Sequence, residues 1–253
     1  MNYYFEDFTE CNYQYLLQKY IKDRECIFFS DALKEEHRII LMRHDIDFSV
    51  HRACKLARIE NSMGIKSTYF LHMNSCFYNL FEKEIYNLVR EILKLGHQVG
   101  LHYDCDFCNN SLINQSEFEK QLKKNRKILS ELFEEEILSF SFHNPTEEIL
   151  NKFSELKYDG MINAYAKEIV TRFKYCSDSN GYWRYQRLEE FLEQNKDEKI
   201  QVLTHPAWWT QEVMSPQERI QRVIKGRSLR TEEQYNSTLK SSNRKNIGYN
   251  NGK

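Results

Sequence analysis

The sequence predicts an α/β fold in which a parallel sheet, or a barrel of parallel strands, carries helices on its outside. Short apolar segments typical of buried strands alternate along the chain with longer segments whose apolar residues recur at helical spacing. The 253 residues include only 8 Gly and 3 Pro, with no internal repeat and no linker before about residue 212. One α/β domain of this size is common, so we expect residues 1–212 to form a single domain.

The expected strands and helices follow one another in order. Strands are expected at 38–42 with an extension to Asp47, and at 65–71, 97–103, 137–142, 161–166, 175–178 and 199–204. Helices are expected near 53–63, 80–95, 116–134, from 147 onward and at 187–195. Gly64 and Gly96 stand where the first two helices must end, and Thr146 precedes two glutamates as an N-cap would. Alternation of this kind favours a parallel sheet over an antiparallel one.

The residues after 212 differ from the rest of the chain. Ser215 and Glu218 have the spacing of a capping box, with Pro216 at the first helical position, so a short helix is expected to begin there. Nine Lys or Arg stand against four Asp or Glu in 211–253. For 213–253 we therefore expect a short helix and a flexible, polar and basic tail; contact with a partner protein or an anionic carrier is the alternative.

Composition excludes several classes of function. The net charge is −1, which gives no general attraction to nucleic acid or to an anionic membrane. No apolar run approaches the roughly 20 residues of a membrane span, and the polar first ten residues do not resemble a signal peptide. Seven cysteines without a secretion signal are typical of reduced thiols, so a cytoplasmic location is expected.

Histidine and aspartate recur where the expected strands end. These residues are His44, Asp45, Asp47, His72, His102, Asp104, His143, Asp178 and His205. One such histidine is more often structural, but the carboxyl ends of parallel barrel strands converge on one mouth, so the whole set is expected to face one cavity. Imidazole and carboxylate together suit Zn²⁺ or another first-row divalent ion with a position left open for water. The pattern therefore predicts metal-assisted hydrolysis.

Six segments carry a resemblance to a known family. They read RHDID (43–47), GIKSTYF (64–70), GHQVGLHYD (96–104), SFHNP (141–145), SDSNGYW (177–183) and THPAWW (204–209). In this order they resemble the polysaccharide deacetylase family, carbohydrate esterase family 4, and most closely a branch associated with bacterial surface-polysaccharide biosynthesis. The resemblance covers about residues 38–210. It implies a distorted (β/α) barrel and a metal-dependent enzyme that removes an N- or O-linked acetyl group from a sugar.

The first two family motifs assign a base and two metal ligands. The family has two adjacent aspartates, a general base and then a ligand, whereas Ile46 separates the two here. The resemblance implies Asp45 as the base and Asp47 as the ligand, and the two roles could be exchanged. His102 matches the first histidine of the second motif, but the second histidine of that motif falls on Asp106.

The third metal ligand is therefore open. In the family's third motif, Arg-x-Pro, this chain has His143 in place of the arginine. We expect His143 to be the third ligand; Asp106 and Asp104 are the alternatives.

The remaining site residues surround this centre. His205 matches the histidine of the final Leu-x-His motif, which implies a general acid for the departing amine. Asp178 is expected to orient His205. We expect Trp208 and Trp209 to form a wall against the sugar or the acetyl methyl group. We expect Arg43 and Arg184 to contact an anionic group of the substrate.

Two classes of function follow from these residues. The first is a zinc-dependent deacetylase whose substrate, given the expected cytoplasmic location, is a nucleotide-linked or lipid-linked sugar used in capsule or lipopolysaccharide-type assembly. A hydrolase of another non-peptide C–N bond is a variant of it. The second is a non-catalytic, deacetylase-like carbohydrate-binding protein, because the second and third motifs are altered.

Overall fold

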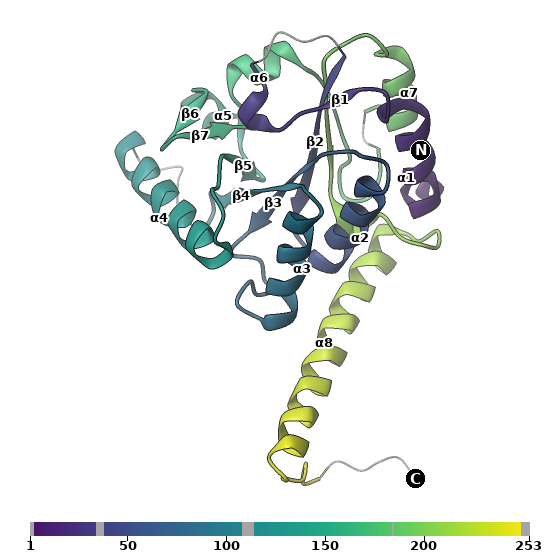
Figure 1. Cartoon of the computed structure of the whole chain (residues 1–253), viewed down its shortest axis with the longest axis vertical. Helices are drawn as coiled ribbons and strands as arrows, with labels where there is room; N and C mark the ends of the chain where they lie inside the picture. The colour runs from purple at the N-terminus through teal and green to yellow at the C-terminus, as the bar shows by residue number, and fades with distance from the viewer. Residues whose placement is uncertain (1–2, 34–37, 108–113, 184, 249–253) are drawn as a thin grey trace.

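The protein is built around one curled sheet with helices on its outer face (Figure 1). The computed structural model describes residues 3–33, 38–107, 114–183 and 185–248. The strands are β1 (Glu25–Cys26), β2 (Ile39–Ile46), β3 (Thr68–His72), β4 (Gln98–Asp104), β5 (Ser139–His143), β6 (Lys157–Tyr158), β7 (Met161–Asn163), β8 (Lys174–Ser177) and β9 (Ile200–Thr204). The α-helices are α1 (Glu10–Leu16), α2 (Val50–Asn61), α3 (Lys83–Lys94), α4 (Gln115–Phe133), α5 (Glu147–Lys152), α6 (Lys167–Arg172), α7 (Leu188–Gln194) and α8 (Pro216–Ser241).

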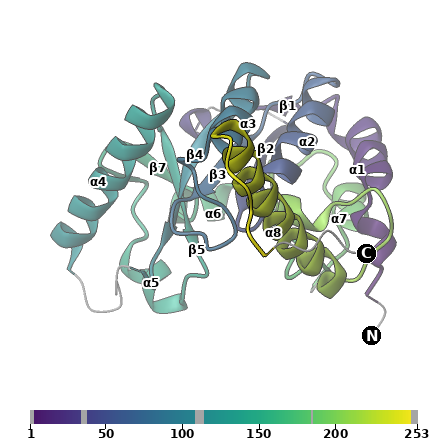
Figure 2. The same ribbon diagram turned by 90° about the horizontal axis from the view of Figure 1, so that it is seen from below.

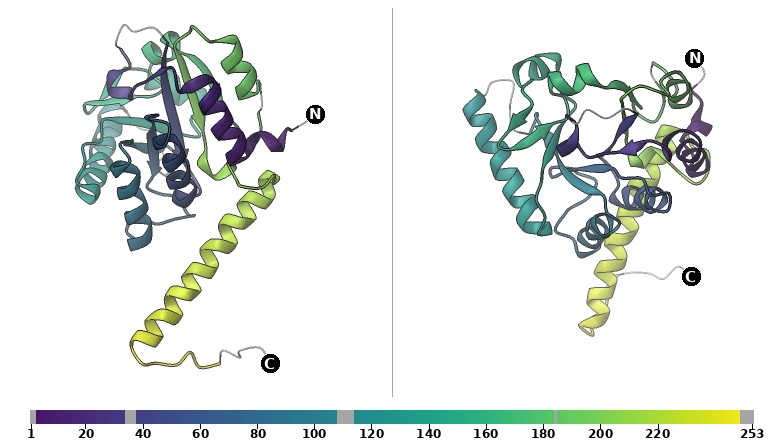
Figure 3. Two further views of the ribbon diagram at one scale, coloured as in Figure 1. Left: turned by 45° about the vertical axis from the view of Figure 1, so that its right-hand side comes forward. Right: turned by 45° about the horizontal axis from the view of Figure 1, so that its top comes forward.

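The strand order is β6-β7-β5-β4-β3-β2-β9-β8, and β1 pairs with β2. All pairs are parallel except the β6–β7 hairpin. Within the described residues the two ends of this order, β6 and β8, do not pair with each other, so the barrel is incompletely closed. Figure 3 shows the strands curling about a common centre inside the ring of helices. The predicted α/β class with a distorted barrel is confirmed.

Strand β2 shows why the site residues face inward. All eight of its residues are buried, and alternate side chains enter different cores. Ile40 and Met42 pack outward with residues of α1 and α2, whereas Ile39 and Leu41 pack into the barrel. Because side chains alternate along a strand, the inward set continues through Asp45.

Most helix ends fall where the sequence predicts them. Gly64 and Gly96 have φ of +73° and +82°, and the Thr146 side chain accepts a hydrogen bond from the backbone N–H of Ile149. Before α2, the N-cap is Ser49, whose side chain accepts from the backbone N–H of Arg52. Ser49, and not Asp47, is therefore the N-cap of α2.

Helix α8 is much longer than the short helix expected. Its 26 residues begin with the predicted capping box between Ser215 and Glu218. Arg219 is its one buried residue within the described part of the helix. Figure 1 shows α8 extending away from the body of the molecule, and in the view from below in Figure 2 it lies in front of the other elements. None of the helices described is both long and apolar enough to cross a membrane.

A buried polar cluster joins the outer side of β2 to α2. Glu60 is fully buried, and its carboxylate accepts hydrogen bonds from Tyr69 (2.6 Å) and Tyr13 and lies 2.7 Å from His44 Nε2. His44 Nδ1 is 3.0 Å from Thr204 Oγ1 on the neighbouring strand. This cluster fixes the ends of β2 and β9 together, directly behind the residues that face the cavity.

Candidate active site

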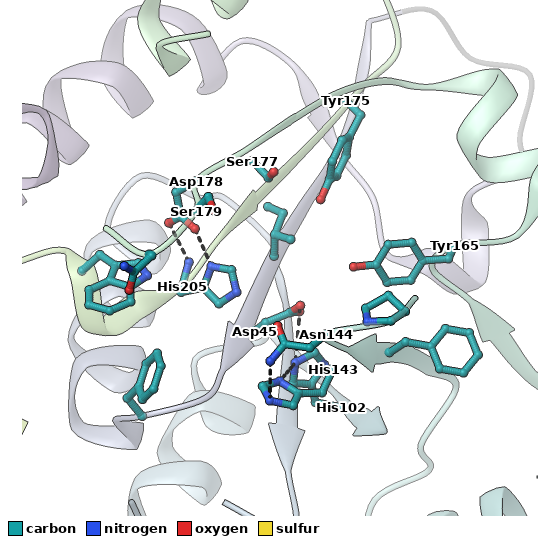
Figure 4. Close-up of a pocket in the computed structure, with 16 residues that line it drawn as sticks. Asp45, His102, His143, Asn144, Tyr165, Tyr175, Ser177, Asp178, Ser179 and His205 are labelled. Carbon is teal, nitrogen blue, oxygen red and sulfur yellow. Dashed lines mark hydrogen bonds and ion pairs between the residues drawn. The ribbon is translucent and has the colours of Figure 1, made fainter. Parts of the chain in front are cut away.

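The strand ends surround a cavity of about 400 Å³ (Figure 4). Parallel pairing in register brings them together: His102 is opposite Ser141, and His44, next to Asp45, is opposite Thr204, next to His205. The cavity is lined by Asp45, Phe48, His102, Phe142, His143, Asn144, Pro145, Tyr165, Tyr175, Ser177, Asp178, Ser179, Asn180, Leu203, His205 and Trp208. Six of the sequence-predicted residues therefore meet here from five different strands or the segments that follow them: Asp45, His102, His143, Asp178, His205 and Trp208.

Three nitrogen and oxygen atoms form a small triangle at the base of the cavity. Asp47 Oδ1 lies 3.1 Å from His102 Nε2 and 3.3 Å from His143 Nδ1, and the two nitrogens are 3.2 Å apart. Despite these short distances, Asp47 Oδ1 is buried without a hydrogen bond of acceptable geometry. The two imidazole nitrogens lie within hydrogen-bonding distance of each other, and the three atoms form a compact set of groups that can bind a metal. Ligands about 2.0–2.1 Å from a tetrahedral zinc ion would lie roughly 3.3 Å apart, so the triangle fits a divalent metal.

Neighbouring side chains set the orientation of the two imidazoles. Ser141 Oγ lies 2.7 Å from His102 Nδ1, so a proton on Nδ1 leaves the lone pair of Nε2 in the triangle. The side-chain amide of Asn144 is 3.0 Å from His143 Nε2. With the amide oxygen facing the ring, it accepts the Nε2 proton and leaves Nδ1 free to bind a metal.

The triangle is electrostatically prepared for a cation. Burial by itself would raise the pKa of Asp47, but the close imidazoles of His102 and His143 and the charge of His205 outweigh it, and the pKa lies well below its ordinary value. Burial would lower the pKa of His143, and the contact with Asp47 outweighs that effect and raises it. In both cases the shift reports opposite charges concentrated at one point.

Asp45 lies beside the triangle and is held by Arg43. The guanidinium donates from Nε to Oδ1 (2.9 Å) and from Nη2 to Oδ2 (2.8 Å). Burial would raise the pKa of Asp45, but Arg43 and His102 outweigh it, so the pKa lies below its ordinary value and the group is a carboxylate. Arg43 was predicted to contact an anionic substrate group. That prediction is wrong, because its side chain is fully buried and committed to Asp45.

His205 faces the triangle from the opposite side of the cavity. Its Nε2 lies 3.7 Å from Asp47 Oδ2, and its Nδ1 forms a hydrogen bond with Asp178 Oδ1. Asp178 Oδ2 also accepts from the backbone N–H of His205 at 2.9 Å. Burial would lower the pKa of His205, but Asp178 outweighs it and raises the pKa to about 9. The contact needed for Asp178 to orient His205 is present.

The alternative ligands lie outside the triangle. Asp104 Oδ2 lies 3.1 Å from His72 Nε2, and Asp104 Oδ1 accepts from the backbone N–H of Asp106. Asp106 is exposed and does not line the cavity. Ligand atoms of Asp47, His72 and His143 also lie within 4.8 Å of one another. This set shares Asp47 and His143 with the triangle, and because Asp104 already contacts His72, we prefer His102 to His72 as the ligand that completes it.

The three other predicted residues have different outcomes. Trp208 lines the cavity, with its ring 5.2 Å from that of Phe48. Trp209 does not; it is fully buried against Phe8 and Tyr13, so its expected place in the wall is wrong. Arg184 lies outside the described residues.

Sequence reasoning did not identify the tyrosines of the opposite wall. Tyr165 and Tyr175 line the cavity (Figure 4), and the ring of Tyr165 lies 4.5 Å from the guanidinium of Arg43. Tyr165 follows β7 by two residues, within a segment predicted as strand to residue 166. A tyrosine just after a strand that ends at the cavity was the available signal.

Comparison with known proteins gives a distant likeness. No protein-family model matches the sequence, and no curated protein matches it. Among solved structures, the catalytic domain of peptidoglycan N-acetylglucosamine deacetylase from Eubacterium rectale is 13% identical with a TM-score of 0.49, covering 78% of this chain and 87% of that one. A family 4 acetyl xylan esterase from Clostridium thermocellum, in complex with a cobalt ion, is 10% identical with a TM-score of 0.45, covering 74% and 84%. A carbohydrate esterase family 4 pseudoenzyme from Bacillus anthracis is 12% identical with a TM-score of 0.43, covering 74% and 60%. At these values the activity must be inferred from the site itself.

Proposed function

We propose that the protein is a metal-dependent hydrolase of the polysaccharide deacetylase type that removes an acetyl group from a sugar. One observation carries the proposal: the Asp47–His102–His143 triangle lies between a carboxylate, Asp45, and an imidazole, His205. The motif resemblance assigns the same roles to Asp45, Asp47, His102 and His205. A non-catalytic binding protein would not need a base and an acid on two sides of a metal site.

The triangle would hold a divalent ion, most simply zinc, through Asp47 Oδ1, His102 Nε2 and His143 Nδ1. When bound, such an ion polarises the carbonyl of the acetyl group and lowers the pKa of water. The fit rests on three converging donor atoms, one of them buried without a hydrogen bond.

Asp45 is the general base in this proposal. Its Oδ2 lies 3.7 Å from His102 Nε2, so it borders the metal site without joining the triangle. Arg43 holds the carboxylate in one orientation and keeps it ionised. An ionised carboxylate at this position can take a proton from water that attacks the acetyl carbonyl.

His205 is the general acid. With a pKa raised to about 9, the imidazole is protonated at neutral pH, and Asp178 holds Nδ1 so that Nε2 faces the cavity. The proton on Nε2 can pass to the sugar nitrogen or oxygen as its bond to the acetyl carbon breaks. Asp45 thus removes a proton on one side of the site, and His205 donates a proton on the other.

The substrate is an acetylated sugar, because the cavity volume of about 400 Å³ suits one or two sugar units with aromatic side chains at the walls. Zinc as the metal, an N- or O-linked acetyl group, a role in surface-polysaccharide assembly and a cytoplasmic location belong to the same proposal, on the motif resemblance and on cysteine usage.

The test is acetate release from N-acetylglucosamine derivatives by wild-type protein, metal-depleted protein and protein with zinc restored. We expect activity to disappear on chelation and to return with metal. Asp45→Asn should retain the metal and lose about 10²–10⁴-fold in kcat, the usual contribution of a general base. Activity that survives complete metal depletion, or an Asp45→Asn variant as active as wild type, would contradict the proposal.

A further inference from the structure

A second cavity, of about 190 Å³, adjoins the first one and shares Phe48 with it. Its walls come from the first turn of α2, from α8, and from Phe77, Tyr78 and Ile85 in α3 and the segment before it. Phe48 follows Asp47 directly in the chain, so the second cavity begins one residue from the proposed metal site.

The described residues that line this cavity include three arginines and a histidine but no Asp or Glu. Two of the arginines have acidic partners outside the lining: Arg52 pairs with Glu10 at 2.6 Å, and Arg230 lies 3.7 Å from Glu84. Arg222 is half-buried and has no hydrogen bond or ion pair within the described part of the chain. Burial lowers the pKa of Arg222, and the charge of Arg52 lowers it further. The charges of Glu212 and Glu10 act in the opposite direction, but neither residue lines the cavity or forms an ion pair with Arg222 in the described part of the chain, so Arg222 is the guanidinium left to meet an anion there.

The N-terminus of α2 adds to this positive potential. The Ser49 side chain accepts from the backbone N–H of Arg52 at 3.3 Å, and the other N–H groups of the first turn have no acceptor within the helix. The dipole of a 12-residue helix favours an anion at this end. An unpaired guanidinium and a helix N-terminus that face one cavity are a combination suited to phosphate.

We propose that the second cavity binds a phosphate group carried by the acetylated sugar, so that the substrate is a sugar phosphate or a sugar linked through a diphosphate. The inference rests on the proposed function for the position of the acetyl group. Asp47 and Ser49 are two residues apart, which separates their Cα atoms by at most about 7.6 Å. One sugar ring can therefore place its acetyl group at the triangle and a phosphate on the ring at the α2 N-terminus, in the cavity that Arg222 also lines.

The experiment compares Arg222→Gln with Lys225→Gln, which removes the same charge from an exposed position on the same helix. Binding of two deacetylated products, glucosamine 1-phosphate and methyl glucosaminide, is measured by calorimetry with zinc present. We expect wild type and Lys225→Gln to bind the phosphate compound more tightly than the neutral one. Arg222→Gln should lose about 10–100-fold for the phosphate compound alone, the effect of one charge-assisted hydrogen bond of about 1.5–3 kcal/mol. Inorganic phosphate should compete in wild type.

A second arm identifies the source of the phosphate. The KM of a nucleoside diphosphate N-acetyl sugar is compared with the KM of a polyprenyl diphosphate N-acetyl sugar in detergent micelles. The substrate whose KM rises in Arg222→Gln, and not in Lys225→Gln, is the one that carries the recognised phosphate.

Equal affinity of wild type for the two products, or equal losses in the two variants, would overturn the inference. If the protein deacetylates neutral sugars and does not bind phosphate, the proposed function holds and the phosphate site is contradicted. If it binds sugar phosphate through Arg222 but releases no acetate, the phosphate site holds and the proposed function is contradicted.

Discussion

At the scale of residues, the choice of third metal ligand depends on the positions of single atoms. His143 Nδ1 belongs to the triangle, whereas Asp104 contacts His72 and Asp106 is exposed. We expect His143→Ala to lower zinc affinity by about 10²-fold or more, Asp104→Ala to lower it less, and Asp106→Ala to leave it unchanged. Titration of each apoprotein with zinc against a competing chelator measures the three affinities. If His143→Ala kept its full zinc affinity and Asp104→Ala lost affinity, the third ligand would instead be a residue of the second motif.

His205 offers a test of proton donation. An amine needs a proton to leave, whereas the leaving group of an activated acetate ester does not. His205→Ala should therefore lose about 10²–10⁴-fold in kcat on an N-acetyl sugar and much less on an aryl acetate. The ratio of ester to amide turnover, at equal metal content, is the measurement. If His205 only packs beside Trp208, both activities should fall together and the ratio should stay constant.

At the scale of elements, the loop between β8 and α7 supports the wall formed by Trp208. Gly181 has a φ of +75°, and a Cβ added there would lie 3.0 Å from Trp208 Cε3. Gly64 has nearly the same φ, +73°, with no atom within 4 Å of an added Cβ. Gly64→Ala should therefore cost only the backbone strain, about 1–2 kcal/mol.

Gly181→Ala should cost the same strain and also displace the indole of Trp208. We expect the melting temperature to fall further in Gly181→Ala than in Gly64→Ala, and the KM for the sugar to rise in Gly181→Ala. Thermal melts of the two variants side by side separate strain from packing. Equal melting temperatures and an unchanged KM would show that the wall adapts without loss.

The strand ends were predictable because strong local patterns marked them. Two aspartates two residues apart on one buried strand must share a face, and parallel register then places His102 and His143 near them. The pairing of Arg43 with Asp45 was not predictable, since an arginine near a cavity reads equally well as a substrate contact. The contact between His72 and Asp104 depends on a separation of 32 residues and on adjacent strand ends.

At the scale of the molecule, α8 is anchored at its first turns and free further on. Arg219 is buried and donates to the backbone oxygens of Gly181 (3.2 Å) and Phe5 (3.0 Å). Arg227 forms an ion pair with Glu82, whereas the residues of the helix beyond 231 are largely exposed. The predicted domain boundary at residue 212 thus precedes contacts that hold both the N-terminal segment and the β8–α7 loop.

A chain that ends at residue 231 should melt within about 2 °C of the full chain, because its buried contacts remain. A chain that ends at residue 215 loses Arg219 and should melt several degrees lower, at about 2–4 °C per kcal/mol for a protein of this size. Calorimetry of the three chains measures the difference. Equal melting temperatures for all three would show that 1–212 is an independent domain, as the sequence predicts.

The carboxylate of Glu60 couples the fold to acidity. Burial would raise its pKa, but His44 outweighs burial and lowers it to about 2. The folded protein therefore binds this proton more weakly than the unfolded chain, where the pKa is near 4.5. The stabilisation from Glu60 is complete above about pH 4.5 and is lost as the pH falls toward 2.

Urea unfolding between these pH values should show a steep loss of stability in wild type. Glu60→Gln should be less stable at neutral pH and flatter in this range, and an exposed control, Glu233→Gln, should follow wild type. The outer side of β2, remote from any substrate, thus sets the acid limit within which the strand that bears Asp45 and Asp47 stays in place.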